Sequence, residues 1–187
     1  VTLLPLGVVL IASLKSKTEF VTTGPFDLPA NLFNLENFVT AFVKGDMVQG
    51  LINTAFILVV SLAGTILVGT MTAYAIDRFT FRGKKIVVGL FLIATLVPGV
   101  TTQVATFQIV NNLGLFNTLA APIVLFLGTD IVSIYIFVQF MSSIPKSLDE
   151  AAMLDGANRW TIYWRVVLPL LKPAIATVVI IRGIAIY

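Results

Sequence analysis

Long apolar runs separated by short polar connections make up most of the chain. Three runs, at residues 51–76, 86–110 and 119–141, are long enough to cross a bilayer, which takes about 20 residues at a rise of 1.5 Å each. They are long and continuous, whereas the strands of membrane barrels are short and alternate between polar and apolar residues. The pattern therefore predicts three complete membrane-spanning helices in an all-α polytopic membrane protein.

Shorter apolar runs occupy both ends of the sequence. Residues 1–14 and 174–187 are each too short for a full crossing, so we expect two partial spans in a single transmembrane domain, residues 1–187, that is incomplete at both ends. A cleaved signal peptide is the alternative for residues 1–14. No basic residue precedes that run, however, and no small-residue cleavage motif follows it.

Small and helix-breaking residues add detail to two of the complete runs. Pro98 and Gly99 lie near the middle of the second run, and proline removes a backbone donor, so we expect a kinked span. Gly64, Gly69 and Ala73 in the first run predict close packing against another helix.

A polar segment at residues 15–50 follows the first partial span. Within it, residues 37–50 place Phe38, Phe42 and Val43 at helical intervals. This spacing predicts a short amphipathic helix on the membrane surface.

The composition agrees with a membrane protein and excludes several kinds of chemistry. The 187 residues are 58% hydrophobic and 11% charged, whereas soluble domains carry about 25% charged residues. They contain no Cys and no His, which removes disulfides, thiol nucleophiles, imidazole bases and zinc clusters. We therefore expect no catalytic, cofactor-binding or metal-binding residues. The net charge of +3 is small and spread along the chain, which does not favour nucleic-acid binding.

Basic residues cluster in two of the connections. Residues 77–85 include four Lys or Arg, residues 143–172 include four more, and residues 111–118 include none. Connections rich in Lys and Arg face the cytoplasm. We therefore expect the first two connections in the cytoplasm, and residues 15–50 and 111–118 outside.

The connection at residues 143–172 is long for a helical bundle, and long connections are normally functional. Ser147 and Glu150 have the spacing of a capping box, which predicts a short helix from about Leu148. Gly156 can supply the left-handed residue that ends this helix.

A second helical stretch follows in the same connection. Its apolar positions recur at helical spacing: Trp160, Tyr163, Trp164 and Val167. We expect this stretch to lie in the headgroup plane with its aromatic face toward the lipid. The Leu-Pro and Lys-Pro pairs that end at Pro169 and Pro173 are expected to stop it and to start the next crossing.

The sequence of this connection resembles a known motif. The run E-A-A-M-L-D-G-A at Glu150–Ala157, with Ile162, Leu168-Pro169 and Pro173, is similar to the EAA loop of permease subunits in binding-protein-dependent ABC importers. Other stretches resemble the carbohydrate-uptake branch, particularly the smaller partner of a maltose-type permease pair. These are N-T-A-F at 53–56, A-Y-A-I-D-R-F-T-F-R-G-K-K at 73–85, Pro98 and L-G-L-F-N-T at 113–118. Members usually have six spans, so the resemblance implies that the start of the first, the end of the fifth and all of the sixth are absent here.

The resemblance implies a type I ABC importer bundle in the cell membrane of a bacterium or archaeon. The subunit would pair with a second permease subunit and form half of the path for a carbohydrate. An extracellular or periplasmic solute-binding protein would deliver the cargo. A dimer of ATP-binding cassette subunits would bind ATP and Mg, since no G-x-x-x-x-G-K-S/T occurs in this sequence. The chain itself is therefore expected to be a transport subunit and not an enzyme.

In that family the EAA helix docks on the ATPase subunit and transmits its closure to the spans. The positions that match the docking loop are Glu150, Ala151, Ala152, Asp155, Gly156, Ala157, Leu168 and Pro169. Ala151 and Ala152 allow another backbone to approach closely, and Glu150 offers a carboxylate to a basic residue of the partner. Capping of an ordinary surface helix is the alternative reading of Ser147, Glu150 and Gly156.

Four polar residues of the spans are candidates for the translocation path. A charge near the bilayer centre costs about 2.5 to 3.5 kcal/mol on insertion scales, so Asp130 and Arg182 are expected to face the interior of the assembly. They either pair with each other or contribute one side chain to the path, and pairing of Asp130 with the second permease is the alternative. Gln103 and Gln108 could bind sugar hydroxyls, or they could contact neighbouring helices or headgroups.

Other function classes fit the sequence less well. An importer of the same scaffold for a non-sugar solute remains an alternative. An ion-coupled secondary transporter is less favoured, because Asp130 is the single acid within the complete spans. An intramembrane aspartyl protease is excluded for the same reason, since that chemistry needs two carboxylates.

Overall fold

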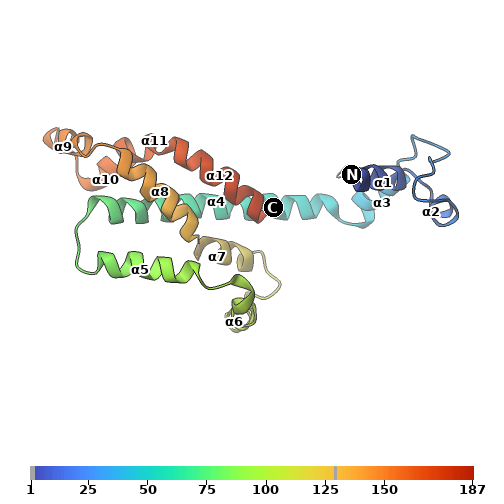
Figure 1. The fold of residues 1–187 in the computed structure, drawn as a ribbon, viewed down its shortest axis with the longest axis horizontal. Coiled ribbons are helices and arrows are strands. Elements are labelled where there is room, and N and C mark those ends of the chain that lie inside the picture. The colour runs from blue at the N-terminus through green and yellow to red at the C-terminus, as the bar shows by residue number, and fades with distance from the viewer. Residues whose placement is uncertain (1–2, 129) are drawn as a thin grey trace. The chain divides into compact units, whose positions relative to one another are not determined.

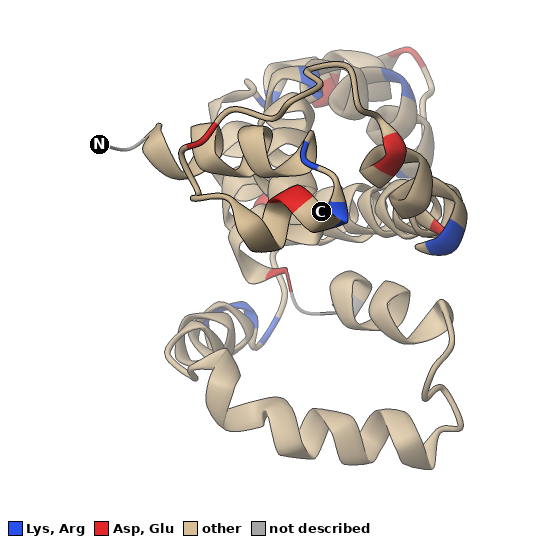
Figure 2. Cartoon of the chain, turned by 90° about the vertical axis from the view of Figure 1, so that its right-hand side faces the viewer, with Lys and Arg blue, Asp and Glu red and all other residues tan. Residues whose placement is uncertain are grey.

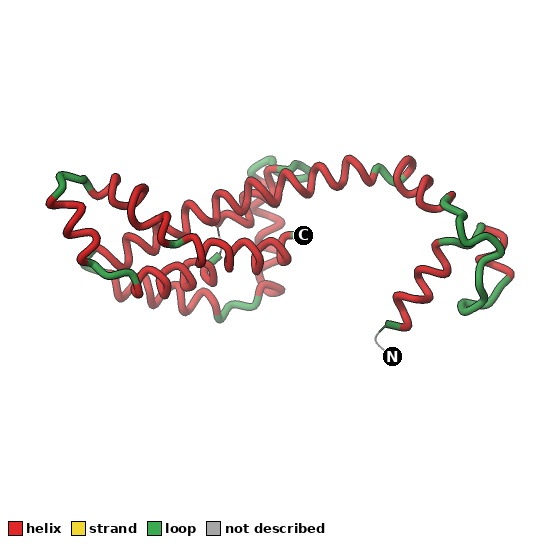
Figure 3. Tube along the Cα trace, turned by 90° about the horizontal axis from the view of Figure 1, so that it is seen from above, coloured by secondary structure: helices red, strands yellow, loops and turns green. Residues whose placement is uncertain are grey.

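The computed structural model of the chain describes residues 3–128 and 130–187, and every regular element in these residues is a helix (Figures 1 and 3). This confirms the predicted all-α class. The chain divides into two compact units, Val1–Asn53 and Thr54–Tyr187.

The first unit contains three short helices, α1 (Leu4–Ser13), α2 (Lys17–Thr22) and α3 (Glu36–Lys44). Helix α1 covers most of the apolar run at residues 1–14, and Pro5 lies in its first turn, where the missing N–H breaks no helical bond. Helix α2 begins after Ser16, which forms a capping box with Glu19.

Buried polar contacts organise the segment between α1 and α3. The Lys15 side chain is buried, and its Nζ donates hydrogen bonds to Thr23 Oγ1 (2.9 Å) and to the Gly24 carbonyl (2.7 Å). The Asn37 amide donates to the carbonyl oxygens of Ser13 (2.9 Å) and Lys15 (2.7 Å). These bonds fix the start of α3 against the end of α1.

The amphipathic helix predicted at residues 37–50 is present but shorter. It is α3, which ends at Lys44 with Gly45 as its C-cap. Asp46 then adopts a left-handed conformation (φ +48°), and residues from Met47 onward belong to the next helix. The three predicted apolar positions, Phe38, Phe42 and Val43, are exposed.

Helix α4 (Met47–Arg78) continues from the first unit into the second. The remaining elements, in chain order, are α5 (Lys84–Thr95), α6 (Gly99–Asn112), α7 (Ala120–Gly128), α8 (Ile131–Ser143), α9 (Ser147–Leu154), α10 (Arg159–Ile162), the π-helical segment η1 (Tyr163–Val167), α11 (Leu168–Leu170) and α12 (Lys172–Ile186).

Among the described residues, α4 is the one helix long and apolar enough to cross a membrane by itself. Its 32 residues extend the predicted span at both ends. Three bent pairs reach the length of a span when each is taken as one: α5 with α6, α7 with α8, and residues 159–170 with α12.

The predicted kink at Pro98 is a sharp break instead. Helices α5 and α6 are inclined by 102°, the geometry of a broken span or a re-entrant loop. Pro98 is the N-cap of α6 with an extended ψ of 130°. Proline has no N–H to donate, and its ring disfavours helical backbone at the preceding Val97, so one helix ends before it and another begins after it.

The predicted span at residues 119–141 is also interrupted. Asp130 is the N-cap of α8 and lies outside both α7 and α8. Asp130 therefore lies at the junction of two helices, which together still reach the length of one span.

Buried side chains of α4, α8, the α10–η1 segment and α12, with Leu171 before α12, form the core of the second unit. Its members are Ala73, Tyr74, Phe137, Met141, Ile162, Tyr163, Val167, Leu171, Ala174 and Val178. Helices α8 and α12 lie side by side (Figure 1). The core therefore joins the helices that precede and follow α9.

Small residues let α4 approach its neighbours, as predicted. A Cβ at Gly69 would lie 2.9 Å from the ring of Phe137, and one at Gly64 would lie 1.8 Å from a methyl carbon of Leu127. Ala73 is fully buried.

Candidate functional site

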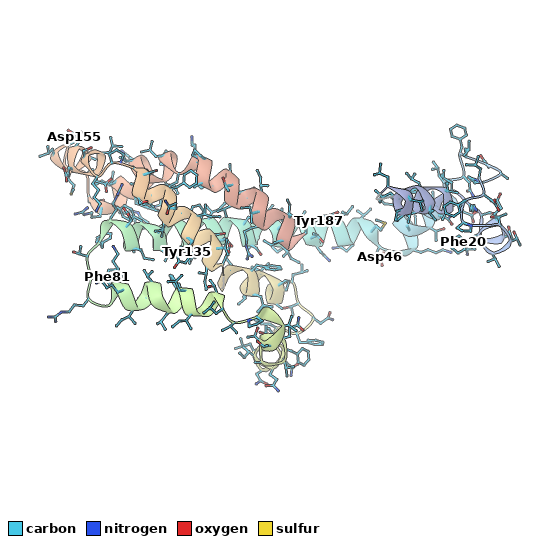
Figure 4. All side chains as sticks on the ribbon, viewed as in Figure 1. Phe20, Asp46, Phe81, Tyr135, Asp155 and Tyr187 are labelled. Carbon is cyan, nitrogen blue, oxygen red and sulfur yellow. The ribbon has the colours of Figure 1, made fainter. Side chains whose placement is uncertain are left out.

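The two connections rich in Lys and Arg lie at the same end of the second unit. Both the turn from α4 to α5, which contains Phe81, and the far end of α9, near Asp155, are found there (Figures 1 and 4). Helices α6 and α7 lie farther along the unit (Figure 1) and carry no charged residue. Figure 2 marks the charged positions on the cartoon, and long stretches of helix carry none. This arrangement agrees with a common membrane side for the two basic connections.

Helix α9 begins one residue earlier than the sequence predicts. Its N-cap is Lys146, which makes no side-chain capping bond, so Ser147 is the first helical residue and the expected capping box is absent. The first turn instead forms from Pro145, whose carbonyl accepts a hydrogen bond from the Leu148 N–H (3.3 Å). Proline pre-sets a backbone angle suited to the start of a helix.

The end of α9 is a tight left-handed turn at Gly156, as predicted. Gly156 has φ +83°, and the Ala157 N–H reaches back to the Ala152 carbonyl (2.9 Å). Nothing lies within 4 Å of the place where a Cβ of Gly156 would be. The glycine is therefore required by the backbone conformation and not by crowding.

The predicted docking positions divide between surface and core. Glu150, Ala151, Asp155, Gly156 and Pro169 are exposed. Ala152, Ala157 and Leu168 are half-buried and pack against the core cluster. The half-buried residues attach this connection to the core, whereas the exposed residues are accessible on its surface.

The exposed surface of α9 also includes an apolar residue that sequence reasoning missed. Leu154, the last residue of the helix, is 90% exposed. Its signal was available in the sequence, because Leu154 directly precedes the polar turn Asp155-Gly156 at the end of a short helix.

A buried ion pair holds the base of α9. Arg78 Nε lies 2.8 Å from Asp149 Oδ2, and the side chains are only 2% and 4% exposed. The Nε–H is not aligned with the carboxylate as a hydrogen bond, so the contact is Coulombic. Arg78 also donates from Nη1 to Asp77 Oδ2 (2.7 Å) and from Nη2 to the Ile144 carbonyl (3.0 Å). One guanidinium thus ties the end of α4 to the corner between α8 and α9.

The aromatic stretch after Gly156 lies partly in the core. Tyr163 and Val167 are buried, and Tyr163 Oη shares a hydrogen bond with Thr70 Oγ1 (2.8 Å). Trp160 and Trp164 are exposed. The expected aromatic face toward lipid is therefore wrong for Tyr163 and Val167, because α4 offers them a protein surface.

The helix after Gly156 passes through Pro169, and it breaks between the two predicted proline pairs, with the next helix starting at Lys172. Residues 163–167 form a π-helix, α11 contains Pro169, and the 68° bend falls at Leu171, before α12. A proline near the start of a helical segment loses few hydrogen bonds. π-Helical turns are rare and are often found at functional sites.

Asp130 and Arg182 meet in the second unit. Arg182 Nε lies 2.8 Å from Asp130 Oδ2, and Arg182 Nη2 donates to the Phe126 carbonyl (3.4 Å). The Asp130 carboxylate also accepts hydrogen bonds from the Ser133 N–H (3.2 Å) and from the Ser133 hydroxyl. Asp130 thereby caps the N-terminus of α8. Of the two roles weighed for this pair, the structure contains the ion pair, and the lining role stays a prediction.

The other two candidates for the path are not part of the Asp130–Arg182 pair. Gln103 and Gln108 are exposed on α6, so a role in the path stays a prediction for both.

Comparison with known proteins places the chain among membrane transport components. The family model described as "Binding-protein-dependent transport system inner membrane component" matches residues 65–186. The galactooligosaccharides transport system permease protein GanQ of Bacillus subtilis is 38% identical over 132 residues, which cover 70% of this chain and 47% of GanQ. The probable starch degradation products transport system permease protein AmyC of Thermoanaerobacterium thermosulfurigenes is 32% identical over 180 residues, covering 95% and 64%.

A third relative and a solved structure give the same picture. The melibiose/raffinose/stachyose import permease protein MelC of Bacillus subtilis is 32% identical over 188 residues, covering 98% of this chain and 66% of MelC. The chain thus spans between about half and two thirds of the length of these curated relatives. A bacterial ABC transporter involved in the import of the acidic polysaccharide alginate shares the fold, with a TM-score of 0.84, 22% identity and coverage of 100% of this chain and 65% of that chain.

Proposed function

The chain belongs to the family of inner membrane components of binding-protein-dependent transport systems, and from this premise we propose that it is a membrane-spanning subunit of an ATP-driven carbohydrate importer. The names of GanQ, AmyC and MelC, which refer to galactooligosaccharides, starch degradation products and melibiose/raffinose/stachyose, support a carbohydrate as cargo.

The proposed mechanism is supported by the way α9 is attached to the rest of the second unit. The helix presents Glu150, Ala151 and Asp155 outward, while the Arg78–Asp149 pair anchors its first turn to the end of α4. A short helix held this way can pass a force to the long helix as a rigid body. We propose that α9 docks on the ATPase subunit and that its movement rotates the spans.

The chain would need several partners for this activity. A second permease subunit would complete the path, an ATPase dimer would bind ATP and Mg, and an extracellular binding protein would deliver the sugar. The sequence of this chain has no P-loop lysine motif to hold a nucleotide. Its own residues would supply the docking surface and half of the path.

The proposed orientation puts α9 and the α4–α5 turn in the cytoplasm. The four basic residues in each of these connections support it, because such connections are retained inside. The connection at 111–118 and residues 15–50 would then lie outside.

Asp130 and Arg182 have a role in this proposal as a pair. Their ion pair neutralises two charges at one level of the bundle, which lowers the cost of keeping either in the membrane. The pair would hold α12 against the start of α8, and one of its members would face the path only when the spans rotate. Gln103 and Gln108 would offer amides to sugar hydroxyls.

The cargo can be tested in the reconstituted transport complex. ATPase activity would be measured with a panel of binding proteins loaded with oligosaccharides, monosaccharides or amino acids. We expect stimulation by a saccharide-loaded protein alone. Stimulation by an amino-acid-loaded protein, and by none of the others, would replace the carbohydrate with another solute.

The docking surface can be tested by cysteine crosslinking, since the chain has no native Cys. Glu150→Cys should crosslink to the ATPase subunit. Asn117→Cys, in the connection at 111–118, is the matched control and should not. Modification of Glu150→Cys by an impermeant thiol reagent added to intact cells would show that the orientation is reversed.

A further inference from the structure

An apolar groove runs between the end of α4 and the α10–η1 segment in the second unit. It has a volume of about 240 Å³, and its lining includes Met71, Tyr74, Phe79, Arg159 and Trp160. This volume is below the range of roughly 300 to 1,000 Å³ that is common for small-molecule pockets. The lining is hydrocarbon and aromatic carbon, which suits an acyl chain better than a sugar.

Arg159, which lines this groove, has no acidic partner among the described residues. The Arg159 guanidinium carbon lies 5.6 Å from the centre of the Phe79 ring. Among the residues that the structure describes, no carboxylate is within ion-pair distance of Arg159, whereas the neighbouring Arg78 is fully engaged by Asp77 and Asp149. Arg159 is exposed. Its charge is therefore neutralised by no carboxylate of the described residues and is available to an anionic ligand, while the guanidinium also rests on the Phe79 ring.

The aromatic side chains around Arg159 are those found at the level of lipid headgroups. Trp160 is 57% exposed and lies 5.9 Å, ring to ring, from Tyr163, while Tyr74 meets Phe79 edge to face at 5.7 Å. Trp and Tyr concentrate at the membrane interface, with apolar rings toward the acyl chains. Basic pockets between helices on the cytoplasmic side bind anionic lipid headgroups.

We propose that this groove is a binding site for an anionic phospholipid of the cytoplasmic leaflet. The phosphate would lie on the Arg159 guanidinium, and one acyl chain would lie in the groove along Met71 and Tyr74. The proposal rests on the proposed orientation of the chain. A lipid held here would contact both α4 and the segment that follows α9, next to the docking helix.

The proposal can be tested by photocrosslinking in the assembled complex with its full-length chain. The probes are phosphatidylglycerol and phosphatidylcholine that carry the same photoreactive acyl chain, and labelled peptides are identified by mass spectrometry. We expect phosphatidylglycerol to label the residues 71–79 and 159–163 several-fold more than phosphatidylcholine does. High salt should reduce this preference, because it screens the attraction between Arg159 and the lipid phosphate. This test uses the wild-type protein alone.

Two arginine variants provide the matched comparison. Arg159→Gln should lower labelling by phosphatidylglycerol to the level of phosphatidylcholine. Arg165→Gln, on the same segment but outside the groove lining, should leave the preference intact. Equal labelling by both lipids, or an equal loss in both variants, would overturn the site. Absence of labelling would mean that a protein partner covers the groove, and would overturn it too.

The labelling result is independent of the cargo. A panel of binding proteins that fails to show carbohydrate-stimulated ATPase would leave the lipid preference unchanged. Conversely, crosslinking of Glu150→Cys to the ATPase together with equal lipid labelling would reject the groove and keep the proposed function.

Discussion

Arg78 Nε and Asp149 Oδ2 are 2.8 Å apart in the interior of the second unit, and they join the last turn of α4 to the first turn of α9. Removal of one member of a buried pair leaves an uncompensated charge and costs about 3 to 5 kcal/mol. The pair therefore decides whether α9 is a rigid extension of α4 or a loosely attached surface helix.

Substitution of Asp149 tests this relationship. Asp149→Asn should destabilise the complex by about 3 kcal/mol or more and should uncouple ATP hydrolysis from uptake, because α9 loses its anchor. Thermal unfolding in detergent and the ratio of sugar transported to ATP hydrolysed would measure the two effects. Asp155→Asn, on the exposed end of α9, is the control and should change stability little.

A double variant separates the pair from its members. Arg78→Met with Asp149→Leu should be less destabilised than Asp149→Asn, because neither charge is left unpaired. If both the single and the double variants keep wild-type stability and coupling, the pair does not anchor α9.

The turn after α9 depends on the backbone of Gly156. A β-branched residue at φ +83° is strained by about 1 to 2 kcal/mol or more, whereas Asn tolerates this conformation. Gly156→Val should therefore weaken co-purification with the ATPase subunit and lower uptake, and Gly156→Asn should stay close to the wild type. Because no atom lies within 4 Å of the added Cβ, the difference reports the backbone and not a clash. Normal uptake in Gly156→Val would contradict the assigned turn.

The sequence predicted those elements whose cause is local. The apolar runs and the left-handed Gly156 follow from residues close together in the chain, and the small residues Gly64 and Gly69 indicated close packing without identifying its partners, Leu127 and Phe137. The sequence did not predict the pairing of Arg78 with Asp149, because each residue already had a local interpretation. Arg78 counted toward membrane orientation, and Asp149 suited the start of a helix.

The interruptions of the spans were missed for a related reason. Asp130 and Ser133 have the spacing of an N-cap, but an apolar run on both sides favoured a continuous helix. The burial of Tyr163 could not be predicted from periodicity, because the same stripe places Trp160 at the surface. Tyr163 is buried and Trp160 is exposed because Tyr163 packs against α4.

The capping box of α2 makes the first unit sensitive to acid. Hydrogen bonds from the backbone of Ser16, and then of Ala30, lower the pKa of the Glu19 carboxyl. A carboxyl whose pKa is lowered by folding contributes stability above its unfolded pKa of about 4.3, and this stability is lost as the pH falls through the folded value. The protection factors of the Ser16 and Ala30 amides, which correct exchange rates for the intrinsic effect of pH, should therefore be high at neutral pH and fall on acidification. Glu19→Gln should remove most of that pH dependence, and an unchanged profile would contradict the assignment.

The Asp130–Arg182 pair can be separated from the cap that Asp130 provides. Asp130→Asn keeps a good N-cap residue for α8 but removes the charge, so Arg182 is left unpaired at a cost of about 2.5 to 3.5 kcal/mol in the membrane. We expect a clear loss of stability in thermal unfolding, and recovery in Asp130→Asn with Arg182→Met. Uptake by the double variant then decides the second role. If the stable double variant transports sugar normally, the pair is structural and neither charge serves the path, whereas a stable but inactive double variant assigns a charge to the path.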